Sequence, residues 1–128
     1  MQTTQNFSLK KPEDTDVVTI QDINDNMDVI DRELKKQRSP LYATLTVSGW
    51  TGSAPPYSQA VNVSGVTTDM EPILVSNLQD GATEAVQKAY AKAFGIVSSG
   101  TAATGNGTVT FKVYKKPVTD ISVGLKGV

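Results

Sequence analysis

Residues 20–34 read IQDINDNMDVIDREL, and their apolar side chains recur at intervals of three and four residues. This spacing places them on one side of an α-helix, in the a and d positions of a heptad repeat. Thr19 and Asp22 give a capping-box-like start, and the basic residues at 35, 36 and 38 complement the helix dipole at the end. The pattern predicts a helix over about residues 19–37. Its apolar stripe consists of Ile20, Ile23, Met27, Ile30 and Leu34.

Two interpretations of the apolar stripe are open. A single amphipathic helix can pack this face on its own domain, or the stripe can pair with copies of itself. The stripe is narrow and its flanking residues are polar, which suits another helix better than a broad sheet. Isoleucine at both a and d favours three or four strands over two. We therefore expect a short trimeric coiled coil, and hence a homotrimer, supported by the rest of the chain because two heptads are marginal alone.

The residues before this helix have a different character. Residues 1–16 are polar, contain Pro12, and offer only Phe7 and Leu9 as sizeable apolar side chains. Such a segment buries too little surface to fold alone, so we expect an extended arm that orders against a partner. Eight of the 13 acidic residues precede position 39. Pro40 disfavours a helical residue before it, which predicts an arm and oligomerisation helix over residues 1–38 and a second domain over residues 39–128.

The second domain alternates between apolar and polar residues, as half-buried strands do. A stripe rich in alanine predicts one helix between Asp80 as N-cap and Gly95 as its stop. Gly105-Asn106-Gly107 predicts a hairpin turn. The expected fold class is α+β, with a small β-sandwich-like antiparallel domain and one helix on a face or edge of the sheet. Strands are expected over residues 41–47, 59–64, 71–76, 96–102, 108–114 and 121–125.

The composition of the chain excludes several classes of reactive site. The 128-residue chain has no cysteine and no histidine, which excludes disulfides, Cys/His zinc sites, a thiol nucleophile and a Ser-His-Asp triad. The carboxylates form no convincing catalytic pair or calcium loop. A net charge of −1 recruits neither nucleic acid nor an anionic membrane, and no apolar run is long enough to span a bilayer. We expect no enzyme activity, cofactor or metal, and we interpret Lys112, Lys115, Lys116 and Lys126 as a solvated edge.

Trp50 and Tyr57 are the candidate ligand-contacting residues. They bracket Pro55-Pro56 in a loop, and one hypothesis is that their rings form a stacking platform for a cell-surface glycan. That function would make the chain a carbohydrate-binding adhesin or receptor-binding module. The other hypothesis, which we favour, is that the two large side chains fix the loop to the core.

Several motifs carry a resemblance to a known class of proteins. Residues 3–16 (TTQNFSLKKPEDTD), 23–31 (INDNMDVID) and 33–36 (ELKK) resemble the N-terminal arm and helix of tail-fibre and tail-appendage proteins of tailed bacteriophages and prophages. In that class a Lys-Pro arm precedes an Asn-x-Asn-x-x-x-Ile-Asp helix. The second domain also resembles C-terminal domains of phage structural proteins, through ATLTVSGWTGS at 43–53, PYSQ at 56–59 and VNVSGV at 61–66.

The resemblance implies a non-enzymatic virion component. Such proteins are usually homotrimers whose N-terminal arm attaches to other tail or baseplate proteins, while the distal domain builds the fibre or contacts the host surface. The N-terminus lacks the basic and apolar regions of a secretory signal, so we expect synthesis in the bacterial cytoplasm and localisation in the virion. Because no long shaft follows the helix, the expectation covers a short appendage, a baseplate piece, a head fibre or a phage-tail-like bacteriocin.

Overall fold

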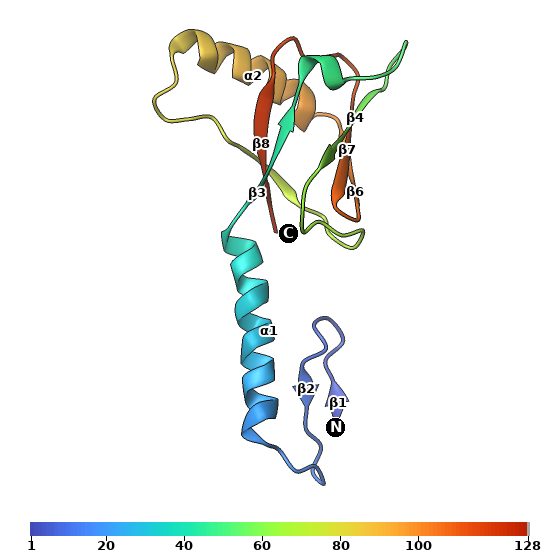
Figure 1. The fold of residues 1–128 in the computed structure, drawn as a ribbon, viewed down its shortest axis with the longest axis vertical. Helices are drawn as coiled ribbons and strands as arrows, with labels where there is room; N and C mark the ends of the chain where they lie inside the picture. The colour runs from blue at the N-terminus through green and yellow to red at the C-terminus, as the bar shows by residue number, and fades with distance from the viewer. Residues whose placement is uncertain (128) are drawn as a thin grey trace. The chain divides into compact units, whose positions relative to one another are not determined.

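The computed structural model describes residues 1–127 and shows an α+β protein with two α-helices and three antiparallel sheets. The chain forms two compact units, Met1–Arg38 and a second that begins at Ser39. Figure 1 shows the order of the elements along the chain. The two units are described separately below.

The first unit contains a β-hairpin, which corrects the expectation of an extended arm. Strand β1 (Gln2–Thr3) pairs antiparallel with β2 (Lys10–Lys11). The turn is closed by the Thr4 amide, which donates to the Leu9 carbonyl at 2.8 Å, and by the Leu9 amide, which donates to the Thr4 hydroxyl at 2.9 Å. The expectation failed because it counted only apolar burial, whereas this segment is ordered by hydrogen bonds. Figure 1 shows the hairpin beside the helix of the same unit.

Helix α1 (Ile20–Arg38) confirms the helix predicted from the heptad spacing. Its start is a reciprocal cap, in which the Thr19 amide donates to the Asp22 carboxylate at 2.9 Å and the Asp22 amide donates to the Thr19 hydroxyl at 3.2 Å. Aspartate therefore fills the place that glutamate usually takes in a capping box. Lys35, Lys36 and Arg38 lie in the last turn, where positive charge is favourable.

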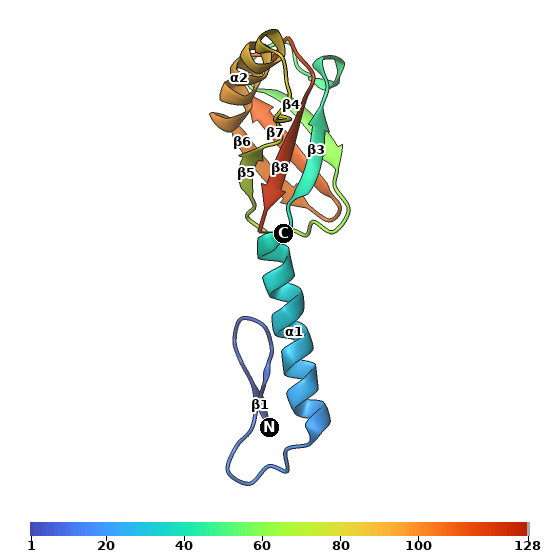
Figure 2. The same ribbon diagram turned by 90° about the vertical axis from the view of Figure 1, so that its left-hand side faces the viewer.

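The second unit contains six strands in two antiparallel sheets, as its alternating pattern predicted. One sheet has the order β3-β8-β5 and the other β4-β7-β6. Figure 2 shows β8 between its two neighbours. A short 3-10 helix, η1 (Val47–Gly49), follows β3. The strands are β3 (Leu41–Leu45), β4 (Tyr57–Asn62), β5 (Ile73–Ser76), β6 (Thr101–Gly105), β7 (Thr108–Val113) and β8 (Ile121–Lys126).

Both sheets contribute to one hydrophobic core. The central strands β7 and β8 supply buried side chains at every second position, because alternate residues of a strand point to the same face. The helix of this unit adds Ala93 and Val97, and β3 adds Ala43 and Leu45. The residues that the two central strands bury are Val109, Phe111 and Val113, and Ile121, Val123 and Leu125.

Helix α2 (Glu84–Ser98) corrects both predicted boundaries of the second helix. Its N-cap is Thr83, whose hydroxyl accepts from the Val86 amide at 3.3 Å, rather than Asp80. The helix continues through Gly95, because Val97 extends the buried stripe beyond the glycine. As a result β6 starts at Thr101. The predicted strand over residues 96–102 was expected to start five residues earlier.

Two glycines provide a matched test of this packing. A Cβ at Gly100 would collide with the backbone carbonyl of Lys112, whereas a Cβ at Gly95, on the exposed side of α2, meets nothing. We expect Gly100→Ala to lower the free energy of unfolding by about 1–3 kcal/mol. Gly95→Ala should raise it by roughly 0.5–1 kcal/mol, because alanine loses less conformational freedom in a helix. Urea unfolding measures both, and equal effects would contradict the assigned packing.

Candidate functional site

Helix α1 presents two distinct faces, and the candidate functional site is the face that carries the apolar stripe. The other face lies against the hairpin and includes the partly buried Asp22, Asp25, Asn26 and Val29. At 3.6 residues per turn the two faces are centred about a third of a turn apart. The hairpin therefore covers one side of the helix and leaves the apolar stripe open.

All five residues of the apolar stripe are exposed within the chain. Their exposed fractions lie between 45% for Ile30 and 77% for Ile20, and no residue of α1 is buried. Burying a side chain of this size is worth about 1.5–3 kcal/mol, and soluble proteins seldom leave a contiguous apolar patch unpaired. The geometry therefore provides a ready surface for helix–helix association. The side chains that share it are Ile20, Ile23, Met27, Ile30 and Leu34, the five that sequence spacing predicted to lie on one face.

A pair of hydrogen bonds from Asn26 fixes the hairpin to the other face of α1. The Lys10 amide donates to Asn26 Oδ1 at 2.7 Å, and Asn26 Nδ2 donates back to the Lys10 carbonyl at 2.8 Å. The asparagine side chain thus pairs with the backbone N–H and C=O of Lys10 on the free edge of β2, as a neighbouring strand would. This contact is not predictable from the sequence pattern, because it joins residues 16 positions apart by polar groups that have no periodic spacing.

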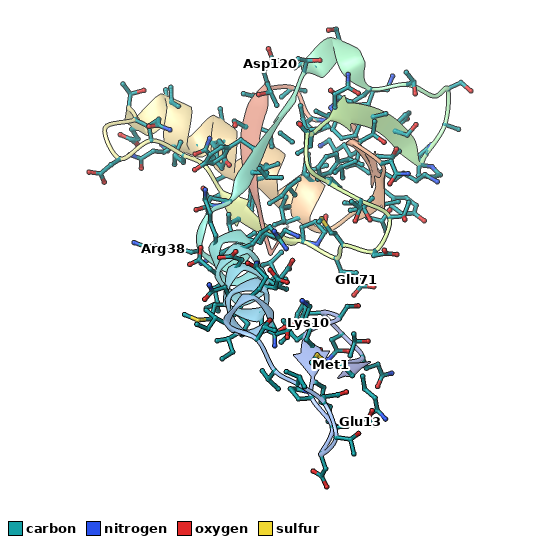
Figure 3. The ribbon with its side chains drawn as sticks, turned by 60° about the horizontal axis from the view of Figure 1, so that its bottom comes forward. Met1, Lys10, Glu13, Arg38, Glu71 and Asp120 are labelled. Atoms are coloured by element: carbon teal, nitrogen blue, oxygen red, sulfur yellow. The ribbon has the colours of Figure 1, made fainter. Side chains whose placement is uncertain are left out.

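The Lys10 side chain adds two ion pairs to the same face of α1. Its ammonium nitrogen lies 2.8 Å from Asp22 Oδ1 and 2.6 Å from Asp25 Oδ2, and Figure 3 shows Lys10 beside the helix. At the start of the hairpin, the N-terminal ammonium of Met1 lies 3.1 Å from the Asp16 carboxylate. These pairs are exposed or half-exposed, so they orient the hairpin more than they stabilise it.

The ion pairs make the docking of the hairpin depend in part on pH. The hydrogen bonds that Lys10 donates to Asp22 and Asp25 raise the pKa of Lys10, and the same hydrogen bond from the Lys10 ammonium lowers the pKa of Asp22 to about 2. Lys10 also lowers the pKa of Asp25. Because the folded pKa values of these carboxyls lie below the ordinary value of 3.8, their contribution is complete above that value. The contribution of Asp22 is lost as the pH falls towards 2.

The tip of the hairpin brings an aromatic ring next to the apolar stripe. Phe7 borders a small hollow of about 200 Å³ on α1, which Ile30 and Leu34 of the stripe also line. The ring is still 54% exposed. The sequence analysis assigned Phe7 to an extended arm and did not connect it with the helix. The remaining residues of the hollow are Val29, Glu33 and Gln37.

Trp50 and Tyr57 do not form the stacking platform considered from the sequence. Trp50 is 5% exposed and belongs to the hydrophobic core, so its ring has no free face for a ligand. Tyr57 packs partly against the same core, and the Lys116 ammonium lies 4.9 Å from the centre of its ring. This arrangement corresponds to the other hypothesis, in which the two rings fix the loop to the core.

A groove of about 620 Å³ in the second unit gathers positive charge. It lies between α2 and the loop after β7, and its floor is aliphatic. The loop is anchored by the buried Pro117. Among the lysines of the groove and within residues 1–127, only Lys88 has a close carboxylate, Glu84, at 2.7 Å. The predicted lysine edge is therefore divided, because Lys115 and Lys116 line this groove, whereas Lys112 and Lys126 do not. The groove combines Lys88, Lys92, Lys115 and Lys116 with Ala93 and Ile96.

No metal or membrane-spanning feature is present in the part of the chain that the structure describes. Residues 1–127 contain no group of three His, Cys, Asp or Glu side chains placed to hold a metal ion. Over the same residues, neither helix has the length and apolar character needed to cross a bilayer.

Comparison with protein-family models, with curated protein sequences and with solved structures finds no match for this chain.

The docking of the hairpin can be tested with two asparagines of α1. In Asn26→Ala the Lys10 amide loses its acceptor, and we expect its hydrogen exchange to accelerate at least tenfold. Asn24→Ala is the matched control, because within residues 1–127 the Asn24 side chain makes no hydrogen bond. Exchange followed by NMR measures both variants. Unchanged protection of Lys10 in Asn26→Ala would show that this contact does not hold the hairpin.

Proposed function

We propose that the protein is a non-enzymatic structural subunit that assembles into a homotrimer through the apolar stripe of α1. The observation that carries this proposal is the exposure of all five apolar a and d side chains on one helix. Association would remove this surface from water, which is the main driving force for helix pairing. Isoleucine at both a and d positions favours three or more helices over two.

Charge placement supports a parallel, in-register arrangement. In the heptad set by the apolar stripe, Glu33 occupies a g position and Arg38 the following e position. In a parallel coiled coil these positions meet between neighbouring helices and commonly form ion pairs. Glu33 of one copy would thus lie near Arg38 of the next. The same pairing repeats at each of the three helix junctions, because the copies are related by rotation.

We further propose that this assembly is part of a phage or prophage virion, as a tail-fibre, baseplate or other appendage protein made in the bacterial cytoplasm. The support is the resemblance of residues 3–36 to the arm and helix of tail-appendage proteins, together with an α+β chain whose helix is free to associate. The hairpin side of the first unit is then available to other virion proteins.

The assembly proposal predicts the effect of charges in the apolar stripe. In the double variant Ile23→Asp, Ile30→Asp, carboxylates would have to be buried at the d positions, so we expect only monomers. Val17→Asp combined with Val18→Asp is the matched control, because both valines are exposed but precede α1. Light scattering gives the mass of each. An oligomer that survives the stripe variant, with α1 still helical by circular dichroism, would rule out this interface.

A second candidate function, contact with the host surface, is supported by the lysine groove. Four of the six lysines that follow residue 39 line this groove. Like charges three to four residues apart on a helix, such as Lys88 and Lys92, repel each other. Concentrated positive charge above an aliphatic floor attracts anionic polymers. We propose that an anionic cell-surface polymer binds here, rather than a glycan stacked on Trp50.

This second function predicts a position-specific loss of binding. Lys115→Glu with Lys116→Glu should weaken binding to immobilised dextran sulfate at least tenfold. The wild-type protein should not bind neutral dextran. Lys112→Glu with Lys126→Glu changes the net charge equally but outside the groove, so it should retain most of the affinity. Surface plasmon resonance at several salt concentrations measures these affinities. Equal losses in the two variants would mean that only net charge matters.

A further inference from the structure

We infer that the β1–β2 hairpin is part of the subunit interface, and that Phe7 contacts α1 of a neighbouring copy of this chain. The inference rests on the proposed self-assembly and adds a second contact to it. It changes the expected role of the N-terminal segment, which becomes a clasp between subunits in addition to any attachment to other proteins.

The hairpin lies on the g side of α1, in the heptad of the apolar stripe. The residue that holds the hairpin, Asn26, is a g position in the heptad of the apolar stripe, and Glu33 is the next g position. In a parallel coiled coil the g side of each helix faces the e side of its neighbour. The hairpin, which is tied to Asn26 by two hydrogen bonds, therefore lies beside the junction between two helices.

Phe7, at the tip of the hairpin, lies beside that junction. Its ring borders the hollow that Ile30, Glu33 and Leu34 line on its own helix. One side of the ring is therefore directed at α1, and 54% of the residue remains exposed. At this level the neighbouring helix presents its e positions, Asp31 and Arg38. An aromatic side chain gains most from burial when a second surface covers its free side.

The neighbouring helix would offer groups that complement Glu33 and Phe7. Arg38 of the neighbour would approach both Glu33 and Phe7, so its guanidinium can pair with the carboxylate while its stem covers the ring. Within its own chain Glu33 is already paired with Lys36, at 3.1 Å. A second copy of the chain would therefore add a second cation beside Glu33 and would supply the apolar surface that covers the exposed side of Phe7. Of the possible occupants, it is the one whose residues are determined by the heptad.

The hairpin is already oriented on α1 within a single chain. Asn26 and the ion pairs of Lys10 with Asp22 and Asp25 fix the hairpin before assembly. A segment that is already ordered loses less conformational entropy when it binds. Because two heptads are marginal as a coiled coil, a preformed clasp with one aromatic anchor would contribute stability that the apolar stripe alone does not supply.

Cysteine cross-linking tests the inference, because the natural chain contains no cysteine. In the double variant Phe7→Cys, Asp31→Cys, the two thiols of one chain lie about a third of a turn apart around α1, with the helix between them, so we expect them to bond only to neighbouring chains. Oxidation should link every chain to both neighbours and give a covalent trimer on a non-reducing gel. The matched control is Phe7→Cys with Arg32→Cys, because position 32 is an outward-facing f position. This variant should give at most dimers.

The outcomes separate the inference from the proposed assembly. A wild type that is monomeric at all concentrations would overturn both. An oligomeric double variant that gives no more cross-linked trimer than the Arg32 control would overturn the clasp and leave the apolar stripe intact.

A second measurement does not depend on disulfide geometry. Phe7→Ala should raise the concentration at which the oligomer dissociates about tenfold, whereas Val17→Ala should not change it. An unchanged dissociation concentration in Phe7→Ala would also contradict the clasp.

Discussion

The structure of the first unit depends on one constraint, which is that the apolar stripe of α1 cannot be covered by the segment that precedes it. That segment is held by polar groups to a different side of the helix, through the hydrogen bonds of Asn26 and the ion pairs of Lys10. The five apolar side chains consequently remain exposed. Exposed apolar area is costly in water, and this constraint is the basis for the proposed association through α1. The proposed assembly and the proposed clasp both follow from it.

The second unit is built on a different principle. Its stability comes from a core that two antiparallel sheets and α2 share, with β7 and β8 at the centre of their sheets. Trp50 belongs to this core and is unavailable as a binding surface. The surface of this unit also carries the lysine groove, where four lysines lie close together. The two proposed functions thus rest on separate elements, the apolar stripe of α1 for assembly and the lysine groove for contact.

The sequence predicted those parts of the structure that rest on local periodicity. Heptad spacing located α1 and its apolar stripe, and alternation located the six strands of the second unit. Features that depend on contacts between distant residues were missed. The hairpin is held by Lys10 and Asn26, the groove joins lysines of α2 to those of a later loop, and α2 ends where Val97 is buried rather than at Gly95. None of these contacts leaves a repeat in the sequence that could be recognised beforehand.

The central claim is that the apolar stripe of α1 assembles the chain into a trimer. Sedimentation equilibrium of the wild-type protein over a wide range of concentrations tests it most directly, because the mass is obtained without any assumption about shape. The account predicts a mass three times the 13.6 kDa of one chain, with dissociation only on dilution. A mass of 13.6 kDa at every concentration would contradict it.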